Sequence, residues 1–453
     1  MKKVLFICVT MLLICISGKA TERNLLLIPY PQQVSIKQGN YNLTDNVKIG
    51  ADPLFTQELK KLQEVLTEDF GLKSQIVKPS KADISLCYDA SFMQEEKEAY
   101  QLEVTDMKIT IRAQMATGIF YGIQSLRQLI KSEAGKWIIP KLTITDYPAL
   151  SWRSFMLDEG RYFKGEKVVK QILDEMALLK MNVFQWHLTD DQGWRIEIKK
   201  YPRLTEIGAF RDSTQMEWYE SHHYDGKPHG GFYTQTQIRS IIKYASERHI
   251  TIIPEIEMPG HSAAAIAAYP WLSATGKEIK VPCNFGVQYD VFNVTDPKVL
   301  NFLNDVIDEV TTLFSSGILH IGGDEVRYDQ WNASSSVQKF IQEKGFSSAS
   351  DIQVWFTNQM SKVIAQKGWR MMGWNDITGE KLHHFQSGDK EGTERLAPGT
   401  IVQFWKGDSD ILQRTAEQGQ HIVNSYNNFT YLNYSYEYDS LQATYEFKPI
   451  SLQ

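Results

Sequence analysis

From about Trp152 onward, short apolar runs alternate with longer segments in which apolar residues recur every three or four positions. A run of four to seven apolar residues is typical of a buried strand, and the longer period is typical of an amphipathic helix. This alternation predicts βαβ units and a parallel sheet. The predicted helices include 167–179, 234–248 and 298–314, and the predicted strands are 154–157, 182–187, 250–256, 318–321, 370–374, 401–405 and 422–425.

Polar or aromatic residues cluster just after each predicted strand. A doubly wound sheet would bring together only the loops at its switch point, whereas a barrel gathers all of them at its C-terminal face. We therefore predict an α/β fold of the (β/α)8 TIM-barrel type, with its site at that face. The clusters are Asp158 and Arg161, His187 and Asp190, Glu255 and His261, Asp324 and Glu325, Trp374 and Asp376, Trp405, and Tyr431.

The predicted barrel lacks an eighth strand before the sequence stops at Gln453. Seven strands leave a seam of unpaired backbone groups, which is costly when buried. We therefore expect that the barrel is truncated before its last strand and the sequence is a fragment, or that another segment closes it.

The first part of the chain has a different pattern. Residues 21–146 mix short alternating runs, such as 100–104 and 108–111, with helical stretches at 53–70 and 118–131. We predict a small, non-catalytic α+β domain here, a turn-rich boundary at 145–148, and a catalytic barrel over 147–453.

Residues 1–20 are typical of a signal peptide, with Lys2-Lys3, an apolar stretch over 4–16 and small residues before Ala20. The stretch is too short to remain as a membrane span. Ile14 before Cys15 is bulkier than a lipoprotein processing site favours, so we expect a soluble exported protein, periplasmic or extracellular. Cys87 and Cys283 then remain, and either a disulfide or two buried thiols is compatible with the sequence.

The composition limits the classes of molecule that the protein is expected to bind. The net charge is −6 and no basic run occurs, which argues against a nucleic-acid partner. The chain has 11 Trp and 21 Tyr, and aromatic faces suit both sugar rings and ordinary core packing.

The most informative feature is the pair Asp324-Glu325, which follows an apolar strand and Gly322-Gly323. Successive strand residues point in opposite directions, so the two carboxylates converge only if the backbone leaves the extended conformation. The two glycines permit this. The pair suggests sugar chemistry, although a solvated turn after a strand would also fit.

Four segments in order, 157–163, 186–194, 254–261 and 320–325, resemble the site loops of glycoside hydrolase family 20, the β-N-acetylhexosaminidases. Segment 116–122 is similar to part of the family's non-catalytic α+β domain. The resemblance implies exo-acting, retaining hydrolysis of terminal β-linked GlcNAc or GalNAc without metal or cofactor, in which the substrate's acetamido oxygen attacks the anomeric carbon and gives an oxazolinium ion.

The resemblance also implies roles for individual residues. Glu325 would be the acid and then the base, with a carboxyl protonated near neutral pH, and Asp324 would accept the acetamido N–H. Arg161 would donate to the sugar 3- and 4-hydroxyls, and Asp190 and His261 would tune the acid from behind.

The remaining implied residues form the pocket. Trp374, Trp405 and Tyr431 would enclose the acetamido methyl, with the Tyr431 hydroxyl donating to the carbonyl oxygen. Asp376 would accept from a sugar or acetamido group. His320 fits a structural core histidine better than a site residue.

The sequence departs from the family pattern in three places. Glu257 stands where the family commonly has an Asp facing the arginine, which lengthens that contact. Asn433 stands where many members have Asp near the 4- and 6-hydroxyls, and loss of that charge would favour tolerance of 6-sulfated GlcNAc. The third departure is the missing strand, because of which we expect weak or no activity from this chain.

Three other functions are weighed against this one. His187, Asp190, His261 and Asp324 could serve a metal-dependent hydrolase. A carbohydrate-binding pseudoenzyme or weakly active fragment is compatible with the missing strand, and a two-carboxylate glycosidase is the third. The preferred hexosamine, its linkage and a possible homo-oligomer are left open by the sequence.

Overall fold

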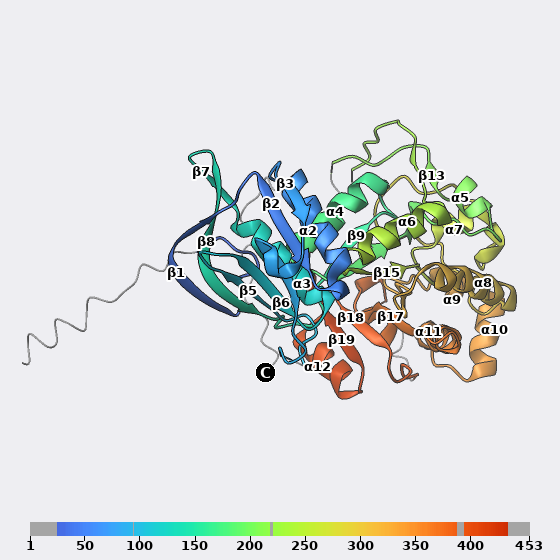
Figure 1. The fold of residues 1–453 in the computed structure, drawn as a ribbon. Coiled ribbons are helices and arrows are strands. Elements are labelled where there is room, and N and C mark those ends of the chain that lie inside the picture. The colour runs from blue at the N-terminus through green and yellow to red at the C-terminus, as the bar shows by residue number, and fades with distance from the viewer. Residues whose placement is uncertain (1–24, 94, 218–220, 387–393, 434–453) are drawn as a thin grey trace, which may run out of the picture. The chain divides into compact units, whose positions relative to one another are not determined.

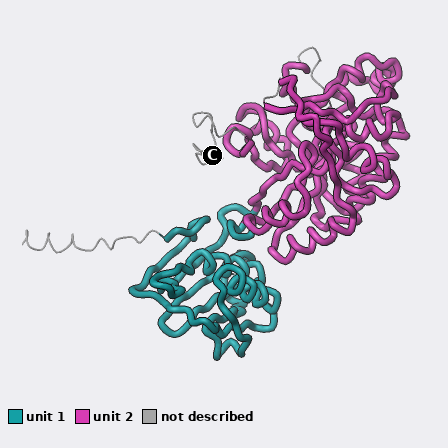
Figure 2. Tube along the Cα trace, turned by 90° about the horizontal axis from the view of Figure 1, so that it is seen from above, with its two compact units in different colours: residues 1–151, 177–180 teal, residues 152–176, 181–453 magenta. Residues whose placement is uncertain are grey.

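The computed structural model describes residues 25–93, 95–217, 221–386 and 394–433. The predicted signal peptide and the last residues of the predicted barrel, 434–453, lie outside these residues. The chain divides into two compact units, one of residues 1–151 with 177–180 and one of residues 152–176 with 181–453 (Figures 1 and 2).

Unit 1 is a mixed sheet with helices α2 (Thr56–Glu68) and α3 (Ala116–Leu129). Its strand order is β1-β8-β5-β6-β4-β2-β3, and β7 pairs with β8. Helix α3 packs on β5 and β6, and α2 packs on β2, β3 and α3, so both helices cover one face of the sheet (Figure 1). The strands are β1 (Gln33–Asn42), β2 (Asn46–Ala51), β3 (Lys73–Ile76), β4 (Ile84–Tyr88), β5 (Tyr100–Val104), β6 (Ile109–Ala113), β7 (Lys131–Glu133) and β8 (Lys136–Asp146).

Unit 2 contains one seven-stranded parallel sheet, and all seven predicted strands are present in it. The order is β9-β10-β15-β16-β17-β18-β19, and within the described residues β9 and β19 each pair with a single neighbour. Because every strand is parallel, all carboxyl ends meet at one edge. The strands are β9 (Ser154–Asp158), β10 (Val183–His187), β15 (Thr251–Glu255), β16 (Ile318–His320), β17 (Arg370–Trp374), β18 (Ile401–Phe404) and β19 (His421–Asn424).

The crossover helices of unit 2 are amphipathic, as the sequence period predicts. In α8, residues Leu303, Val306, Ile307 and Val310 are all buried. The longer helices are α4 (Glu166–Leu178), α6 (Gln235–Ser246), α8 (Pro297–Leu313), α10 (Ser335–Lys344), α11 (Ala349–Gln366) and α12 (Ser409–Glu417). The short elements are α5 (Arg203–Glu206), α7 (Ala263–Ala268), α9 (Asp329–Ala333), α13 (Asn427–Thr430), and the two-stranded pairs β11 (Thr189–Asp190) with β12 (Gly193–Trp194) and β13 (Phe210–Arg211) with β14 (His229–Gly230).

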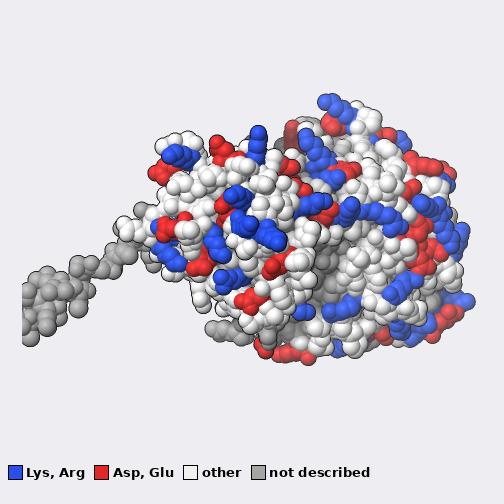
Figure 3. Space-filling model, viewed as in Figure 1, with Lys and Arg blue, Asp and Glu red and all other residues white. Residues whose placement is uncertain are grey.

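The two described cysteines are unpaired, and the surface carries charges of both signs. Cys87 and Cys283 are free thiols. Basic and acidic side chains are interspersed on the face shown in Figure 3. Among the described residues, no helix combines the length and apolarity that a membrane crossing requires.

Helix α6 begins with a capping box that gives a stability prediction. The Thr234 hydroxyl oxygen accepts from the Gln237 N–H at 3.2 Å, and the Gln237 side chain accepts from the Thr234 N–H at 2.9 Å. We expect Thr234→Ala to lower the free energy of unfolding by about 1 kcal/mol in urea denaturation. Thr234→Ser, which keeps the hydroxyl, should recover most of the loss, and equal losses in the two variants would contradict the role of the cap.

Candidate active site

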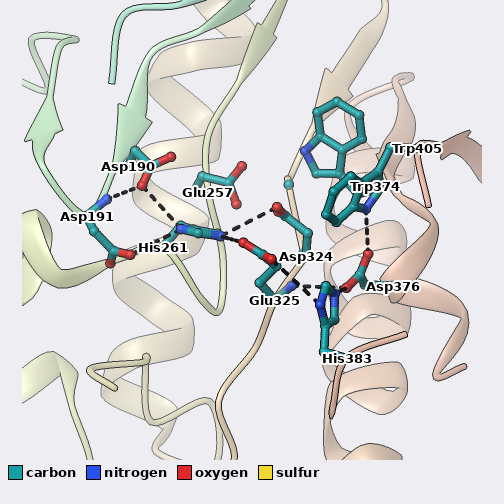
Figure 4. A network of polar contacts seen from close by, with 12 residues as sticks. Asp190, Asp191, Glu257, His261, Asp324, Glu325, Trp374, Asp376, His383 and Trp405 are labelled. Atoms are coloured by element: carbon teal, nitrogen blue, oxygen red, sulfur yellow. Dashed lines mark hydrogen bonds and ion pairs between the residues drawn. The ribbon is translucent and has the colours of Figure 1, made fainter. Parts of the chain in front are cut away.

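The two neighbouring acids Asp324 and Glu325 converge, as the sequence predicts, because the backbone leaves the strand conformation after β16. Gly322, Gly323 and Glu325 have φ values of 63°, 86° and 51°. Asp324 Oδ2 and Glu325 Oε2 lie 3.5 and 3.4 Å from the same nitrogen, His261 Nε2 (Figure 4). The two acid side chains are 13% and 20% exposed, so a ligand can reach both.

His261 joins these acids to a second carboxylate pair. Its Nδ1 lies 3.2 Å from Asp190 Oδ1 and 3.1 Å from Asp191 Oδ2. Burial by itself lowers the pKa of the ring, but the charges of Asp190 and Asp324 outweigh it and raise the pKa well above its usual value. The raised pKa favours an imidazolium whose Nδ1 faces Asp190 and Asp191 and whose Nε2 faces Asp324 and Glu325. Sequence analysis placed Asp190 and His261 here and missed Asp191, which the Asp-Asp repeat could have indicated.

The state of Glu325 differs from the expectation. Burial raises the pKa of the Glu325 carboxyl. The hydrogen bond and charge of His261 lower this pKa by a larger amount, so that the net shift is downward. The lowered pKa favours an ionised Glu325 carboxylate beside a protonated His261. The sequence-based expectation of a protonated Glu325 was wrong for this state, because the motif does not reveal that a buried cation lies beside the carboxylate.

Arg161 is held by two carboxylates. Its Nη1 lies 2.8 Å from Asp158 Oδ2 and its Nη2 lies 3.3 Å from Asp190 Oδ2. Within the described residues Glu257 makes no ion pair with Arg161, so the expectation of a lengthened Glu257–Arg161 contact was wrong. The Glu257 carboxyl instead packs against the backbone of Gly322, where a Cβ would collide with it.

The aromatic residues predicted to enclose a pocket lie together. The Trp374 and Trp405 rings are 6.4 Å apart at 72°, and Trp405 stacks on Tyr431 at 6.4 Å and 13°. Trp374 Nε1 donates to Glu255 Oε1 at 2.8 Å, which fixes the indole. Burial and the charge of Asp324 raise the pKa of Tyr431, so its hydroxyl stays protonated and can donate.

Both carboxylate oxygens of Asp376 accept hydrogen bonds from other protein groups. Its Oδ1 accepts from the Glu325 N–H at 3.1 Å and from His383 Nε2 at 2.7 Å, and its Oδ2 accepts from Trp405 Nε1 at 2.9 Å. Asp376 is only 2% exposed. Both oxygens accept from protein donors, and the expectation that Asp376 also accepts from the sugar stays a prediction. Asp376 supports the acid and the pocket wall, and His383, like Asp191, was not predicted from the sequence.

Two remaining predicted residues have simpler positions. His320 is fully buried and its Nδ1 accepts from the Gly322 N–H at 3.0 Å, as expected for a core histidine. Asn433 is exposed at the end of the described residues.

Several histidine–carboxylate groups have the spacing of metal ligands, and their histidines have raised pKa values. Each such group among the described residues includes His187 or His261. Burial lowers the pKa of His187, and the charges of Glu255 and Asp158 raise it to about 9 overall. A protonated imidazole has no lone pair to offer a metal. In its protonated form each histidine instead gives ionic support to the acids around it.

A parallel β/α sheet with paired acids and aromatic walls at its carboxyl edge defines a hydrolase of the TIM-barrel class. Residues 150–451 match the model of the glycosyl hydrolase family 20 catalytic domain, and residues 24–147 match that of the family's domain 2. The chain belongs to glycosyl hydrolase family 20.

Known relatives agree. A beta-hexosaminidase of Porphyromonas gingivalis is 38% identical over 432 residues, covering 90% of this chain and 52% of the relative. One of Vibrio furnissii is 34% identical, covering 91% and 65%. The chain thus spans between about half and two thirds of these relatives' length.

Solved structures support the same fold. The beta-N-acetylhexosaminidase of Bacteroides fragilis has a TM-score of 0.73 at 32% identity, covering 89% of this chain and 76% of that one. An exo β-N-acetylglucosaminidase of Vibrio harveyi, solved with N-acetylglucosamine, has a TM-score of 0.77 at 29% identity, covering 90% and 61%. The predicted TIM-barrel class is confirmed.

Gly323 gives a prediction about the acid loop. A Cβ there would collide with Ile377 Cγ2, whereas one at Gly317, also with positive φ, meets open space. We expect Gly323→Ala to displace both acids and lower hydrolysis of a nitrophenyl β-N-acetylglucosaminide about 100-fold. Gly317→Ala should cost only backbone strain of about 1 kcal/mol, seen as a lower melting temperature with activity kept. Equal activity losses would contradict this account.

His187 gives a pH prediction. Its pKa is raised from 6.5 to about 9 in the folded protein, so its stabilisation is complete below pH 6.5 and is lost as the pH rises toward 9. The shift corresponds to about 3 kcal/mol in the free energy of unfolding. We expect His187→Gln to flatten the fall in stability between pH 6.5 and 9, measured by urea denaturation. Substitution of the exposed His222 by Gln should leave the slope unchanged.

Proposed function

We propose that this chain is an exo-acting, retaining β-N-acetylhexosaminidase that removes terminal β-linked GlcNAc or GalNAc by substrate-assisted catalysis. The observation that carries the proposal is the placement of Asp324 and Glu325 on one imidazolium, beside an aromatic wall. An arrangement of this kind lets two acids act on a single N-acetylated ring.

Asp324 is suited to hold the acetamido group. Its Oδ2 faces His261, while its Oδ1 is buried and has no hydrogen-bond donor within the described residues. A buried acceptor without a donor is costly. The acetamido N–H of a bound sugar would satisfy it and would direct the carbonyl oxygen toward the anomeric carbon.

Glu325 and His261 are suited to share the catalytic proton. The pKa of His261 is raised and that of Glu325 is lowered, which favours a proton on the imidazole, whose Nε2 lies 3.4 Å from Glu325 Oε2. A bound sugar displaces water and disfavours the carboxylate, so the proton can pass to Glu325. The pH dependence of catalysis therefore reflects the coupled titration of Glu325 and His261 and not that of either residue alone.

The reaction then proceeds in two balanced steps. The acetamido oxygen bonds to the anomeric carbon as the glycosidic bond breaks, and Glu325 gives its proton to the leaving oxygen. Water then adds to the same carbon, giving a proton to Glu325, and the bond to the acetamido oxygen breaks. Two inversions give net retention.

The pocket residues support terminal cleavage. The Arg161 guanidinium, held by Asp158 and Asp190, is 32% exposed and can donate to the far hydroxyls of a terminal ring. Trp405 and Tyr431 offer apolar faces to the acetamido methyl. The exo action named for the Vibrio harveyi enzyme supports the same assignment.

Export is a separate part of the proposal, supported by the Lys2-Lys3 and apolar pattern of residues 1–20. A periplasmic or extracellular protein of this kind would meet free glycans. A binding protein without catalysis is the second candidate, but binding gives no reason for a proton shared beside the acid.

The proposal is tested by exchanging the acid. We expect Glu325→Gln to lower hydrolysis of phenyl β-N-acetylglucosaminide by a factor of about 100 to 10,000. The matched control is Glu343→Gln on the exposed surface of α10, which should keep full activity. NMR should show the β-anomer as first product, a thiazoline analogue should inhibit, and EDTA should have no effect. Inversion of configuration would exclude the mechanism, and absence of turnover in the unmodified chain would favour the binding protein.

A further inference from the structure

His383 lies between the acid and the pocket wall. Its Nε2 is 2.7 Å from Asp376 Oδ1, and its Nδ1 is 3.2 Å from Lys406 Nζ and 3.6 Å from Glu325 Oε1 (Figure 4). The side chain is 3% exposed. It comes from the segment between β17 and β18, outside every motif that identified the other site residues.

The contacts fix the tautomer of this ring. The Lys406 ammonium can only donate, so His383 Nδ1 must accept. The ring hydrogen is then on Nε2, where it is donated to Asp376. Asp376 is thereby oriented to accept from the Glu325 N–H and from Trp405 Nε1.

Stacking fixes the plane of the same ring. The His383 and Phe385 rings are 5.0 Å apart at 9°, and the His383 and Trp405 rings are 5.9 Å apart at 30°. An imidazole that stacks on two rings and is contacted at both nitrogens is held in one orientation, so it can hold its partners in place.

We propose that His383 is a positioning residue for the acid Glu325, acting through Asp376. This inference rests on the proposed function and deepens it. The two Glu325 oxygens face unlike nitrogens: Oε2 faces the donor His261 Nε2, and Oε1 faces the acceptor His383 Nδ1.

Two variants separate positioning from packing. His383→Gln can still donate an N–H toward Asp376 but loses the stacked ring. His383→Phe keeps the stack between Phe385 and Trp405 but cannot donate. If the hydrogen bond matters, the Gln variant is rescued and the Phe variant is not, and a packing role gives the reverse order.

Two leaving groups report on the acid. Phenyl β-N-acetylglucosaminide needs protonation to lose phenol, whereas the 2,4-dinitrophenyl glycoside does not. We expect His383→Phe to lower kcat/KM for the phenyl substrate about tenfold more than for the dinitrophenyl substrate, and His383→Gln to stay within about threefold of the unmodified chain on both. Circular dichroism melts check that both variants fold.

The outcomes distinguish the two proposals. Equal losses on the two substrates, an unimpaired Phe variant, or a Gln variant as impaired as Phe would each overturn the role of His383 while leaving the proposed function standing. An unmodified chain that cleaves neither substrate would overturn the proposed function, and this inference with it.

Discussion

The site depends on one imidazolium ring that lies between two pairs of carboxylates. His261 contacts Asp190 and Asp191 through Nδ1, and Asp324 and Glu325 through Nε2. Like charges at such separations repel by about 4 kcal/mol per pair at an effective dielectric constant near 20. A protonated His261 offsets this repulsion, so the ring holds the loops after β10, β15 and β16 together.

The charge of His261 bears both on the stability of the acid cluster and on the proposed proton transfer. Removing one partner from a buried ionic network is strongly destabilising, because the remaining charges lose their compensation. Here the compensating proton lies next to the carboxyl that is proposed to use it. Stability of the acid cluster and supply of the catalytic proton are therefore two consequences of one contact.

A second support acts from the other side of the acid. Asp376 binds the Glu325 backbone with one oxygen and the Trp405 indole with the other, and His383 orients it. The position of the acid and the shape of the aromatic wall are thus coupled. A change in one shifts the other, since interiors of this density transmit small displacements.

Much of the fold and of the candidate site could be predicted from residues close together in the chain. The seven strands were predicted because strands buried on both faces are continuous apolar runs, and their parallel order placed Asp324, Glu325 and the aromatic residues at one edge. Asp376 was assigned to the sugar because its neighbourhood in sequence shows no donors, although Trp405 and His383 reach it from later segments. Glu257 was assigned to Arg161 by analogy, whereas its longer side chain ends at Gly322.

The class of fold, the edge that carries the site and the identity of the acid pair can be predicted from the sequence, since periodicity and motif are local properties. The charge of each group and the contacts of each carboxylate depend instead on the three-dimensional fold. Protonation depends on burial and on charges a few ångströms away, and those neighbours come from strands far apart in the chain. For that reason the sequence does not reveal the lowered pKa of Glu325, the protein donors that contact Asp376 or the position of His383.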